Sequence, residues 1–187
     1  MRLFTGLSLG NEVCGKIEAA LDELRATADL NWSPTENLHI TTKFIGEWPA
    51  AALPDIQHAL AALEPPGPFS VAVSRFGFYP TPHRPRFLFA GVQAGPELNE
   101  LARRLDEALA AVGCAREERP YLPHVTLARI KAEDIRQLRE RIALIVNMNN
   151  FDFGSFEALE FHLYRSERTP RGPVYTKVSG YSLVRPA

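Results

Sequence analysis

Two histidines in this sequence each stand two residues before a threonine, and both pairs lie inside short apolar segments. The first pair is His39 with Thr41, and the second is His124 with Thr126. Alternate residues of a β-strand point to the same face of a sheet, about 7 Å apart at roughly 3.3 Å per residue. Each segment therefore presents an imidazole and a hydroxyl on one face. Two such strands facing each other would offer two groups that titrate near neutral pH, which suits general acid–base chemistry at a phosphate.

The two motifs differ in the residue that ends them. His39-Ile-Thr-Thr-Lys-Phe44 aligns with His124-Val-Thr-Leu-Ala-Arg129, so Phe44 and Arg129 are equivalent. Arg129 can form charge-assisted hydrogen bonds with phosphoryl oxygens, and Phe44 can pack beside the site or stack on a base. Each lies five residues from its histidine, and this odd offset points it to the other face of an ideal strand. Arg129 is expected to reach a phosphate only if its strand ends or bends there.

Composition limits the class of protein. The chain has 187 residues and a net charge of −1, from 21 basic and 22 acidic side chains. This balance excludes a general basic coat for nucleic acid but permits a local basic pocket. No apolar run approaches the roughly 20 residues of a membrane-spanning helix, and the first ten residues indicate a strand, not a secretory signal. Cys14 and Cys114 indicate reduced thiols in a cytoplasmic protein.

The remaining histidines do not suggest a metal site. His58, His83 and His162 are expected to be solvated, no pair has HExxH spacing, and there is no Cys–His cluster. We therefore expect neither a catalytic metal nor another cofactor.

Apolar spacing predicts strands that alternate with amphipathic helices. The prolines of 65–68 end the second helix, and the proline-rich connection 79–85 is expected to be stiff. In order, the expected elements are strand 2–9, helix 13–24, strand 37–45, helix 53–63, strands 69–78 and 86–93, helix 98–112, strand 122–129, a helix through Ile135, Leu138, Ile142 and Ile145, and strands 156–165 and 173–184.

This order predicts an α+β or mixed α/β protein. The motifs are 85 residues apart (124 − 39), and each is flanked by helices. We therefore expect two similar lobes related by a pseudo-twofold axis, with the motifs facing each other. Because no linker or low-complexity segment divides the halves, residues 1–187 are expected to form one compact bilobal domain.

The motifs and their surroundings resemble the two-histidine (2H) phosphoesterase superfamily. Closer still, the chain is similar to the bacterial and archaeal RNA 2′,3′-cyclic phosphodiesterases, historically called 2′-5′ RNA ligases. Segments 37–46 and 123–129 match the two signature blocks, and Leu163-Tyr-Arg-Ser166, Pro170-Arg-Gly172 and Tyr175 are similar to the closing strands. A single HxT motif is a weak signal, whereas two copies in matching contexts with the matching tail are a strong one.

The resemblance implies an α+β, bilobal pseudo-twofold fold, in which two antiparallel sheets line a central cleft and helices lie outside. It implies metal-independent hydrolysis of 2′,3′-cyclic phosphates to 2′-phosphates, on RNA ends or cyclic nucleotides, with no membrane partner. We expect a cytoplasmic monomer. Thr42 and Lys43 depart from the commonest first block and are expected to flank the site, where they would affect substrate preference.

Opening a cyclic phosphodiester requires one proton acceptor for the attacking water and one proton donor for the leaving ribose oxygen. Following the family, His39 is assigned as the proton donor and His124 as the proton acceptor. Thr41, Thr126 and Arg129 can bind the phosphoryl oxygens, where negative charge grows.

Several alternatives remain open. The two threonines could be ordinary β-formers, Arg129 a surface ion-pair partner, and Phe44 a core residue. The loop 79–86 is either one lip of the cleft or a connector. The cations Arg165, Arg168, Arg171 and Lys177 form either a solvated edge or a contact for RNA. The alternative functions are a 2′-5′ RNA ligase that joins tRNA halves and a non-catalytic module that binds phosphorylated nucleotides.

Overall fold

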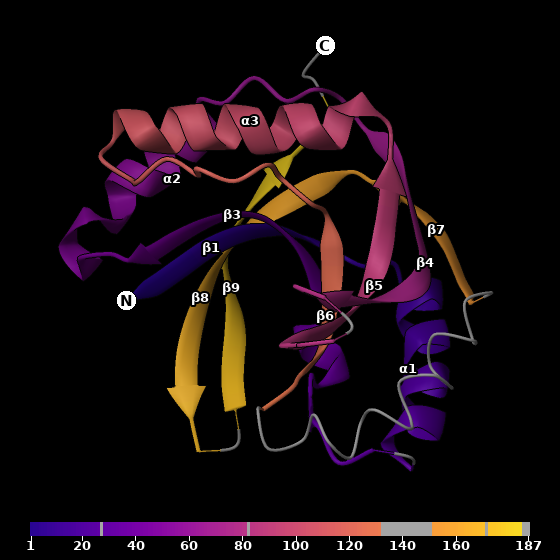
Figure 1. Ribbon diagram of the computed structural model, residues 1–187. Coiled ribbons are helices and arrows are strands. Elements are labelled where there is room, and N and C mark those ends of the chain that lie inside the picture. The colour runs from indigo at the N-terminus through magenta and orange to yellow at the C-terminus, as the bar shows by residue number, and fades with distance from the viewer. Residues whose placement is uncertain (27, 82, 132–150, 171, 185–187) are drawn as a thin grey trace.

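Antiparallel strands organise the chain. The computed structural model describes residues 1–26, 28–81, 83–131, 151–170 and 172–184. Its strands are β1 (Arg2–Ser8), β2 (Asn31–Trp32), β3 (His39–Glu47), β4 (Phe69–Tyr79), β5 (Phe87–Ala94), β6 (His124–Arg129), β7 (Asp152–Ala158), β8 (Glu160–Thr169) and β9 (Gly172–Ser182). They form one curled sheet in the order β7-β4-β5-β6-β3-β1-β8-β9, and β2 pairs with β6 (Figure 1).

The sheet consists of two equivalent halves. One half is β9-β8-β1-β3 and the other is β7-β4-β5-β6, so the histidine strands β3 and β6 are innermost in both. These two strands meet antiparallel at one residue pair, Ile40 with Val125. The predicted α+β class and the repeated plan of the two halves are confirmed. The two predicted sheets are the halves of one continuous sheet.

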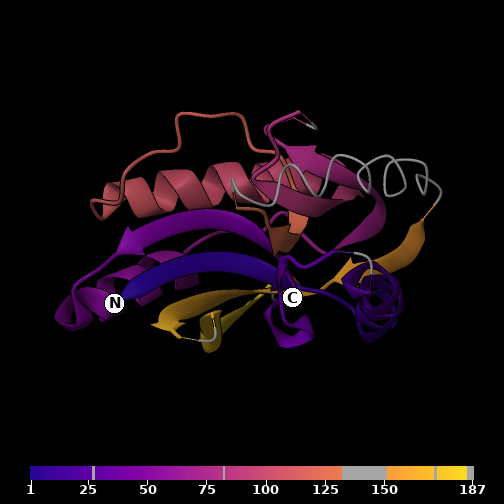
Figure 2. The same ribbon diagram turned by 60° about the horizontal axis from the view of Figure 1, so that its bottom comes forward.

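Three α-helices are described, and all three were predicted. They are α1 (Asn11–Arg25), α2 (Leu53–Ala61) and α3 (Pro96–Ala111), with short 3-10 turns at Thr35–Asn37 and Ala50–Ala52. Each helix buries its apolar stripe, as with Val13, Ile17 and Leu21 of α1. Figure 1 shows α2 and α3 together at the top and α1 at the lower right, near β7. A tilted view shows α3 lying along β3 and β1 (Figure 2).

The helix-facing side of the sheet forms the core. Ile40 and Val125 are fully buried there, each between a histidine and a threonine that point to the other side. We call the side that carries His39 and His124 the histidine face. Burying one such aliphatic side chain stabilises the fold by about 1.5–3 kcal/mol, so a one-residue slip of either strand would be strongly opposed.

Some elements differ from the predictions. The strand expected over 156–165 is two strands, because strand pairing is interrupted at Leu159, whose side chain is exposed. The short β2 has too few residues to show alternation. The helix predicted through Ile135 and Ile145 lies outside the described residues. No described helix is long and apolar enough to cross a membrane.

Candidate active site

The structure brings the two histidines and the two motif threonines to one face, as the alternation predicted. Because β3 and β6 are antiparallel around Ile40 and Val125, each histidine is directed toward the threonine of the other strand. The two imidazoles interact electrostatically, since the charge of His124 lowers the pKa of His39.

Each histidine is oriented by the same backbone contact. His39 Nδ1 lies 2.7 Å from the Asn37 carbonyl oxygen, and His124 Nδ1 lies 2.7 Å from that of Leu122. A carbonyl only accepts, so Nδ1 carries the hydrogen in both rings. Nε2 is therefore the nitrogen that can exchange a proton with a substrate. The equivalent contact in both strands fixes the tautomer and the direction of each ring.

His39 is held in its neutral form. Its Nε2 lies 2.9 Å from the Thr41 hydroxyl, which donates to the unprotonated nitrogen. Burial lowers the pKa of His39, the hydrogen bond to the Asn37 carbonyl opposes this, and the charge of His124 lowers the pKa further. At neutral pH, before any substrate binds, His39 is a proton acceptor.

Aromatic rings enclose His39. Its ring is 4.7 Å from that of Phe4 and 5.1 Å from that of Tyr175, which meets it edge-on. Tyr164 stacks on Phe4 in the same cluster, and its hydroxyl lies 3.0 Å from the Ser8 hydroxyl. His124 is more exposed and contacts Phe89 edge-on at 5.7 Å. The two histidines therefore have different environments despite their equivalent backbones.

Each histidine strand contains a β-bulge between its histidine and the residue five positions later. Between β1 and β3, Gly6 pairs with Thr41 but Thr5 pairs with Lys43, which leaves Thr42 as an extra residue. Between β5 and β6 the register likewise skips Leu127. A bulge adds one residue to a strand and reverses the facing of everything beyond it. The two bulges are equivalent, because Thr42 and Leu127 each stand three residues after their histidine.

The bulges return Phe44 and Arg129 to the histidine face. Phe44 pairs with Phe4, with ring centroids 6.3 Å apart, and its side chain is 57% exposed. The alternative interpretation of Phe44 as a core residue is therefore wrong. Arg129 is exposed, and its guanidinium lies over the Phe87 ring at 5.2 Å. The strand bend that Arg129 needed in order to point toward the site is present.

The same bulge overturns the expectation for Thr42 and Lys43. Both side chains are buried on the helix side instead of flanking the site. Thr42 forms a 2.8 Å hydroxyl hydrogen bond with Thr5. Lys43 forms an ion pair with Asp106 of α3. These two residues therefore act on the shape of β3 from the side opposite the histidine face.

Two residues at the site make contacts that residue spacing did not predict. The Tyr121 hydroxyl donates a 2.9 Å hydrogen bond to the Thr41 carbonyl, and so connects the chain before His124 to the strand of His39. Burial raises the pKa of Tyr121. Asn37 is buried, and its side-chain amide donates to the Pro173 carbonyl at 2.7 Å. Such contacts join distant segments through backbone groups, which local spacing does not reveal.

The other three histidines differ from one another in exposure. His58 and His83 are exposed as expected. The prediction for His162 is wrong, because its side chain is buried and lies 3.3 Å from the Glu160 carboxylate; burial and the charge of Lys177 lower its pKa. In the basic tail, Arg165 pairs with Glu167, and Arg171 lies outside the described residues. The described residues hold no group of three His, Cys, Asp or Glu that could bind a metal.

Residues 15–170, most of the chain, match the model of the 2′-5′ RNA ligase superfamily. The chain belongs to this superfamily. It is 32% identical over 98% of its length to the RNA 2′,3′-cyclic phosphodiesterase of Methanothermobacter thermautotrophicus, of which it covers 99%. It is 34% identical over 98% of its length to the enzyme of that name from Thermus thermophilus, of which it covers 90%.

Two solved structures share the fold of this chain. A crystal structure of TT0787 from Thermus thermophilus superimposes with a TM-score of 0.79 at 30% identity, covering 98% of both chains. That of E. coli LigT in complex with 3′-AMP gives a TM-score of 0.78 at 23% identity, also over 98% of both chains. The similarity of fold to these two structures therefore extends over 98% of the chain.

Proposed function

We propose that this protein is an RNA 2′,3′-cyclic phosphodiesterase that opens the ring by two-histidine acid–base catalysis. The observation that carries the proposal is the pair of equivalently oriented imidazoles, each with Nδ1 bound to a backbone carbonyl. Their Nε2 atoms belong to neighbouring strands of one sheet face. The names of the relatives that match almost the whole chain point to the same substrate.

In the proposed reaction, one imidazole accepts a proton from a water as its oxygen attacks phosphorus. The bond between phosphorus and the 3′ oxygen breaks, and the other imidazole donates a proton to that oxygen. The product is a 2′-phosphate with a free 3′-hydroxyl. Each proton transfer contributes about 10²–10⁴-fold to the rate. Thr41 and Thr126 donate hydrogen bonds to the phosphoryl oxygens, and Arg129 adds positive charge beside them. Phe44, exposed at the edge of the same face, stacks on the terminal base.

The environment of His39 bears on which histidine is the acid. The sequence assignment gave that role to His39, yet its lowered pKa and the hydroxyl donated by Thr41 favour a neutral ring. A neutral ring in the free protein is ready to accept a proton. We therefore propose the reverse polarity, with His39 as the base and His124 as the acid.

The reaction itself is tested with 2′,3′-cyclic AMP in buffer containing a chelator. The wild type should yield the 2′-phosphate, and His39→Ala and His124→Ala should each reduce kcat by at least about 10²-fold. A chain that binds the nucleotide and returns it unchanged would be a binding module instead. Loss of activity in the chelator would contradict metal independence.

The polarity is tested with a substrate whose 3′ oxygen is replaced by sulfur. A thiolate leaves without a proton because its conjugate acid has a pKa near that of a free thiol, about 8.5. The variant that lacks the acid should recover most of its rate on this substrate, whereas the variant that lacks the base should not. Recovery by His124→Ala supports the proposed polarity, and recovery by His39→Ala reverses it. We further propose that the protein acts as a cytoplasmic monomer on RNA ends, which gel filtration at working concentration tests.

A further inference from the structure

The two halves of the sheet build the same row of side chains at the end of the histidine strand. In one half, Tyr164 of β8 pairs with Phe4 of β1, which pairs with Phe44 of β3. In the other half, the register partners are Tyr79 of β4, Phe87 of β5 and Arg129 of β6. Partners on neighbouring strands point to the same face of a sheet. Each half therefore lays a tyrosine and a phenylalanine side by side on the histidine face.

The first row is closed by the protein itself. Phe4 and Tyr164 stack with centroids 4.9 Å apart and planes 7° from parallel. Tyr175 of β9 meets Phe4 edge-on at 5.0 Å. As a result Phe4 is 3% exposed and Tyr164 is 6% exposed. Phe4 and Tyr164 therefore serve as the wall of the His39 site and leave no ring face for a ligand, so that Phe44 is the only exposed ring of the three.

The equivalent row in the other half is open. Tyr79 is 42% exposed. The Phe87 ring is covered by the Arg129 guanidinium at 5.2 Å. A second guanidinium, from Arg119, lies 3.5 Å from the Tyr79 hydroxyl. Where the first half adds Tyr175 as a further ring, this half places cations beside an exposed ring.

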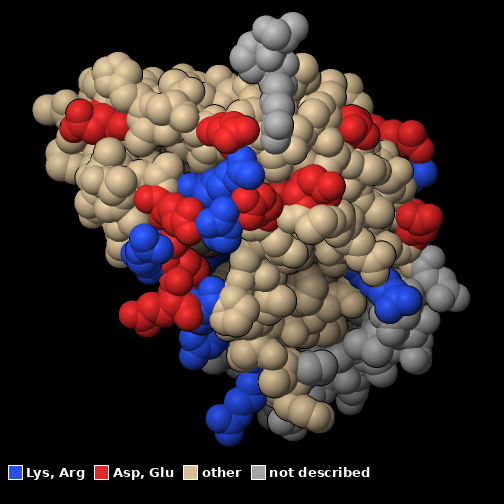
Figure 3. All heavy atoms as spheres, turned by 90° about the horizontal axis from the view of Figure 1, so that it is seen from above, with Lys and Arg blue, Asp and Glu red and all other residues tan. Residues whose placement is uncertain are grey.

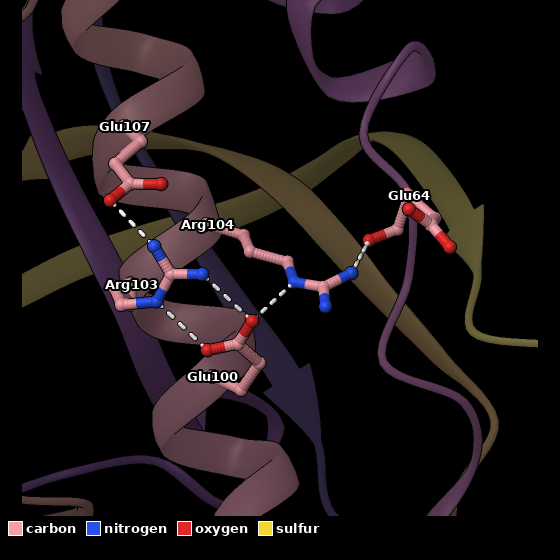
Figure 4. A network of polar contacts seen from close by, with 5 residues as sticks. All are labelled: Glu64, Glu100, Arg103, Arg104 and Glu107. Atoms are coloured by element: carbon pink, nitrogen blue, oxygen red, sulfur yellow. Dashed lines mark hydrogen bonds and ion pairs between the residues drawn. The ribbon is translucent and has the colours of Figure 1, made fainter.

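Arg119 and Arg129 differ from the paired arginines of α3. On α3, Arg103 and Arg104 are neutralised by Glu100 and Glu107 within 2.6–2.8 Å (Figure 4). The face seen from above shows acidic and basic side chains intermingled (Figure 3). Within the described residues, Arg119 and Arg129 form no ion pair. Exposed guanidinium groups beside an open aromatic ring are the features that bind single-stranded nucleic acid.

The row of Tyr79, Phe87 and Arg129 lies about one nucleotide away from the two histidines. With Leu127 bulged out, Arg129 is two sheet positions beyond Thr126, or about 7 Å along the strand. Phe87 and Tyr79 lie one and two strands to the side, at about 4.8 Å per strand. A strand whose terminal phosphate lies between the histidines would carry its preceding nucleotide over this row.

We propose that Tyr79 and Arg119 form a subsite for the nucleotide that precedes the cyclic-phosphate end of an RNA strand. The base of that nucleotide stacks on Tyr79, next to the Phe87–Arg129 pair, and the phosphodiester that joins it to the terminal nucleotide pairs with Arg119. This inference rests on the proposed function and narrows its substrate to an RNA strand. A cyclic mononucleotide would leave the subsite empty.

The test compares 2′,3′-cyclic AMP with a short oligonucleotide that ends in the same cyclic adenylate. Base stacking on an aromatic side chain contributes about 1–3 kcal/mol. Tyr79→Ala should therefore raise KM for the oligonucleotide by about 5- to 150-fold and leave both kcat and KM for the mononucleotide within about twofold. Tyr79→Phe keeps the ring and should behave as the wild type.

Arg119→Ala should also raise KM for the oligonucleotide alone. It should reduce the slope of log KM against log salt concentration by about 0.7, the value of one single-strand phosphate contact.

Arg103→Ala is the matched control, because it removes an arginine whose partners lie on its own helix. It should change neither substrate's kinetics. Equal effects of Tyr79→Ala on both substrates, or none on either, would overturn the subsite while leaving the phosphodiesterase intact. Failure of the wild type to open either substrate would instead overturn the proposed function.

Discussion

The Lys43 ammonium lies 2.7 Å from an Asp106 carboxylate oxygen, in an ion pair of which the lysine side chain is only 4% exposed. The same ammonium donates to the Ala115 carbonyl at 2.7 Å, and the Glu117 amide donates to Asp106 at 2.9 Å. The pair therefore ties the strand of His39 to α3 and to the segment that leads to His124. It connects the two motifs from the side of the sheet opposite the chemistry.

Removing Asp106 should destabilise the protein strongly, because it would leave the buried Lys43 ammonium without an opposite charge. Asp106→Ala is expected to lower the free energy of unfolding by about 3–5 kcal/mol, measured by urea denaturation. Arg103→Ala breaks an exposed network of similar size and should lower the free energy of unfolding far less, because solvent screens surface ion pairs. Equal losses in the two variants would contradict the structural role assigned to the Lys43–Asp106 pair.

The effects of removing the buried hydroxyls of Thr5 and Thr42 on the free energy of unfolding should not be additive. Thr42→Val keeps the shape of the bulge residue but leaves the Thr5 hydroxyl buried without its 2.8 Å partner. The expected cost is about 1–3 kcal/mol. The double variant with Thr5→Val removes both hydroxyls and should recover much of that loss. A double-mutant cycle by thermal or chemical denaturation measures the coupling, and strictly additive costs would argue against the pair.

Gly77 is required by the Phe89 ring that contacts His124. A methyl group at position 77 would lie 2.3 Å from Phe89 Cζ, closer than atoms can approach. Gly77→Ala should therefore displace Phe89 and, through it, the His124 ring 5.7 Å away. We expect a fall in kcat of about 10-fold or more, given the sensitivity of proton transfer to placement. Adding Phe89→Leu removes the clash and should restore part of the stability lost by Gly77→Ala, which denaturation measures.

The lowered pKa of His39 predicts how stability depends on pH. Unfolding returns this imidazole to an ordinary pKa near 6.5. Below that pH the unfolded chain binds a proton that folded His39 resists, so stability falls as the pH drops from about 6.5 toward the folded pKa. His39→Gln lacks this group, and its urea midpoint should fall less than the wild type's between pH 7 and pH 5. The His39 ring itself should titrate below pH 6.5 by NMR. A midpoint above 6.5 would contradict the burial effect.

Most of the described elements and the faces of the motif residues followed from apolar periodicity, as Ile40 and Val125 illustrate. The orientation of Phe44 and Arg129 did not, since five residues is an odd spacing in an ideal strand. The clue was present nonetheless. Both motifs carry two consecutive residues that become buried, Thr42-Lys43 and Leu127-Ala128, where simple alternation would bury only one. Lys43 concealed this clue, because a lysine in a strand is expected to be exposed and only Asp106 of α3 makes its burial favourable.

The residues around the histidines were harder to predict for another reason. Tyr121, Asn37 and Tyr175 reach the site through contacts between segments distant in sequence. The resemblance covered Asn37 and Tyr175 but did not indicate these contacts. His162 was misplaced because the alternation of β8 suggests a polar outer face, whereas β8 lies between β1 and β9 and its ring is buried there.

The strands that carry the two histidines share a single residue pair, Ile40 with Val125, within the described part of the sheet. Along the rest of β6 the short β2 takes the place of β3. Direct pairing between the two histidine strands is therefore limited to one residue pair, at the place where the proposed reaction occurs. A phosphate held between His39 and His124 would supply a cross-link that the backbone lacks, so substrate binding would strengthen the junction of the two halves. Slower amide exchange along β3 and β6 on addition of nucleotide would then report occupancy of the site directly.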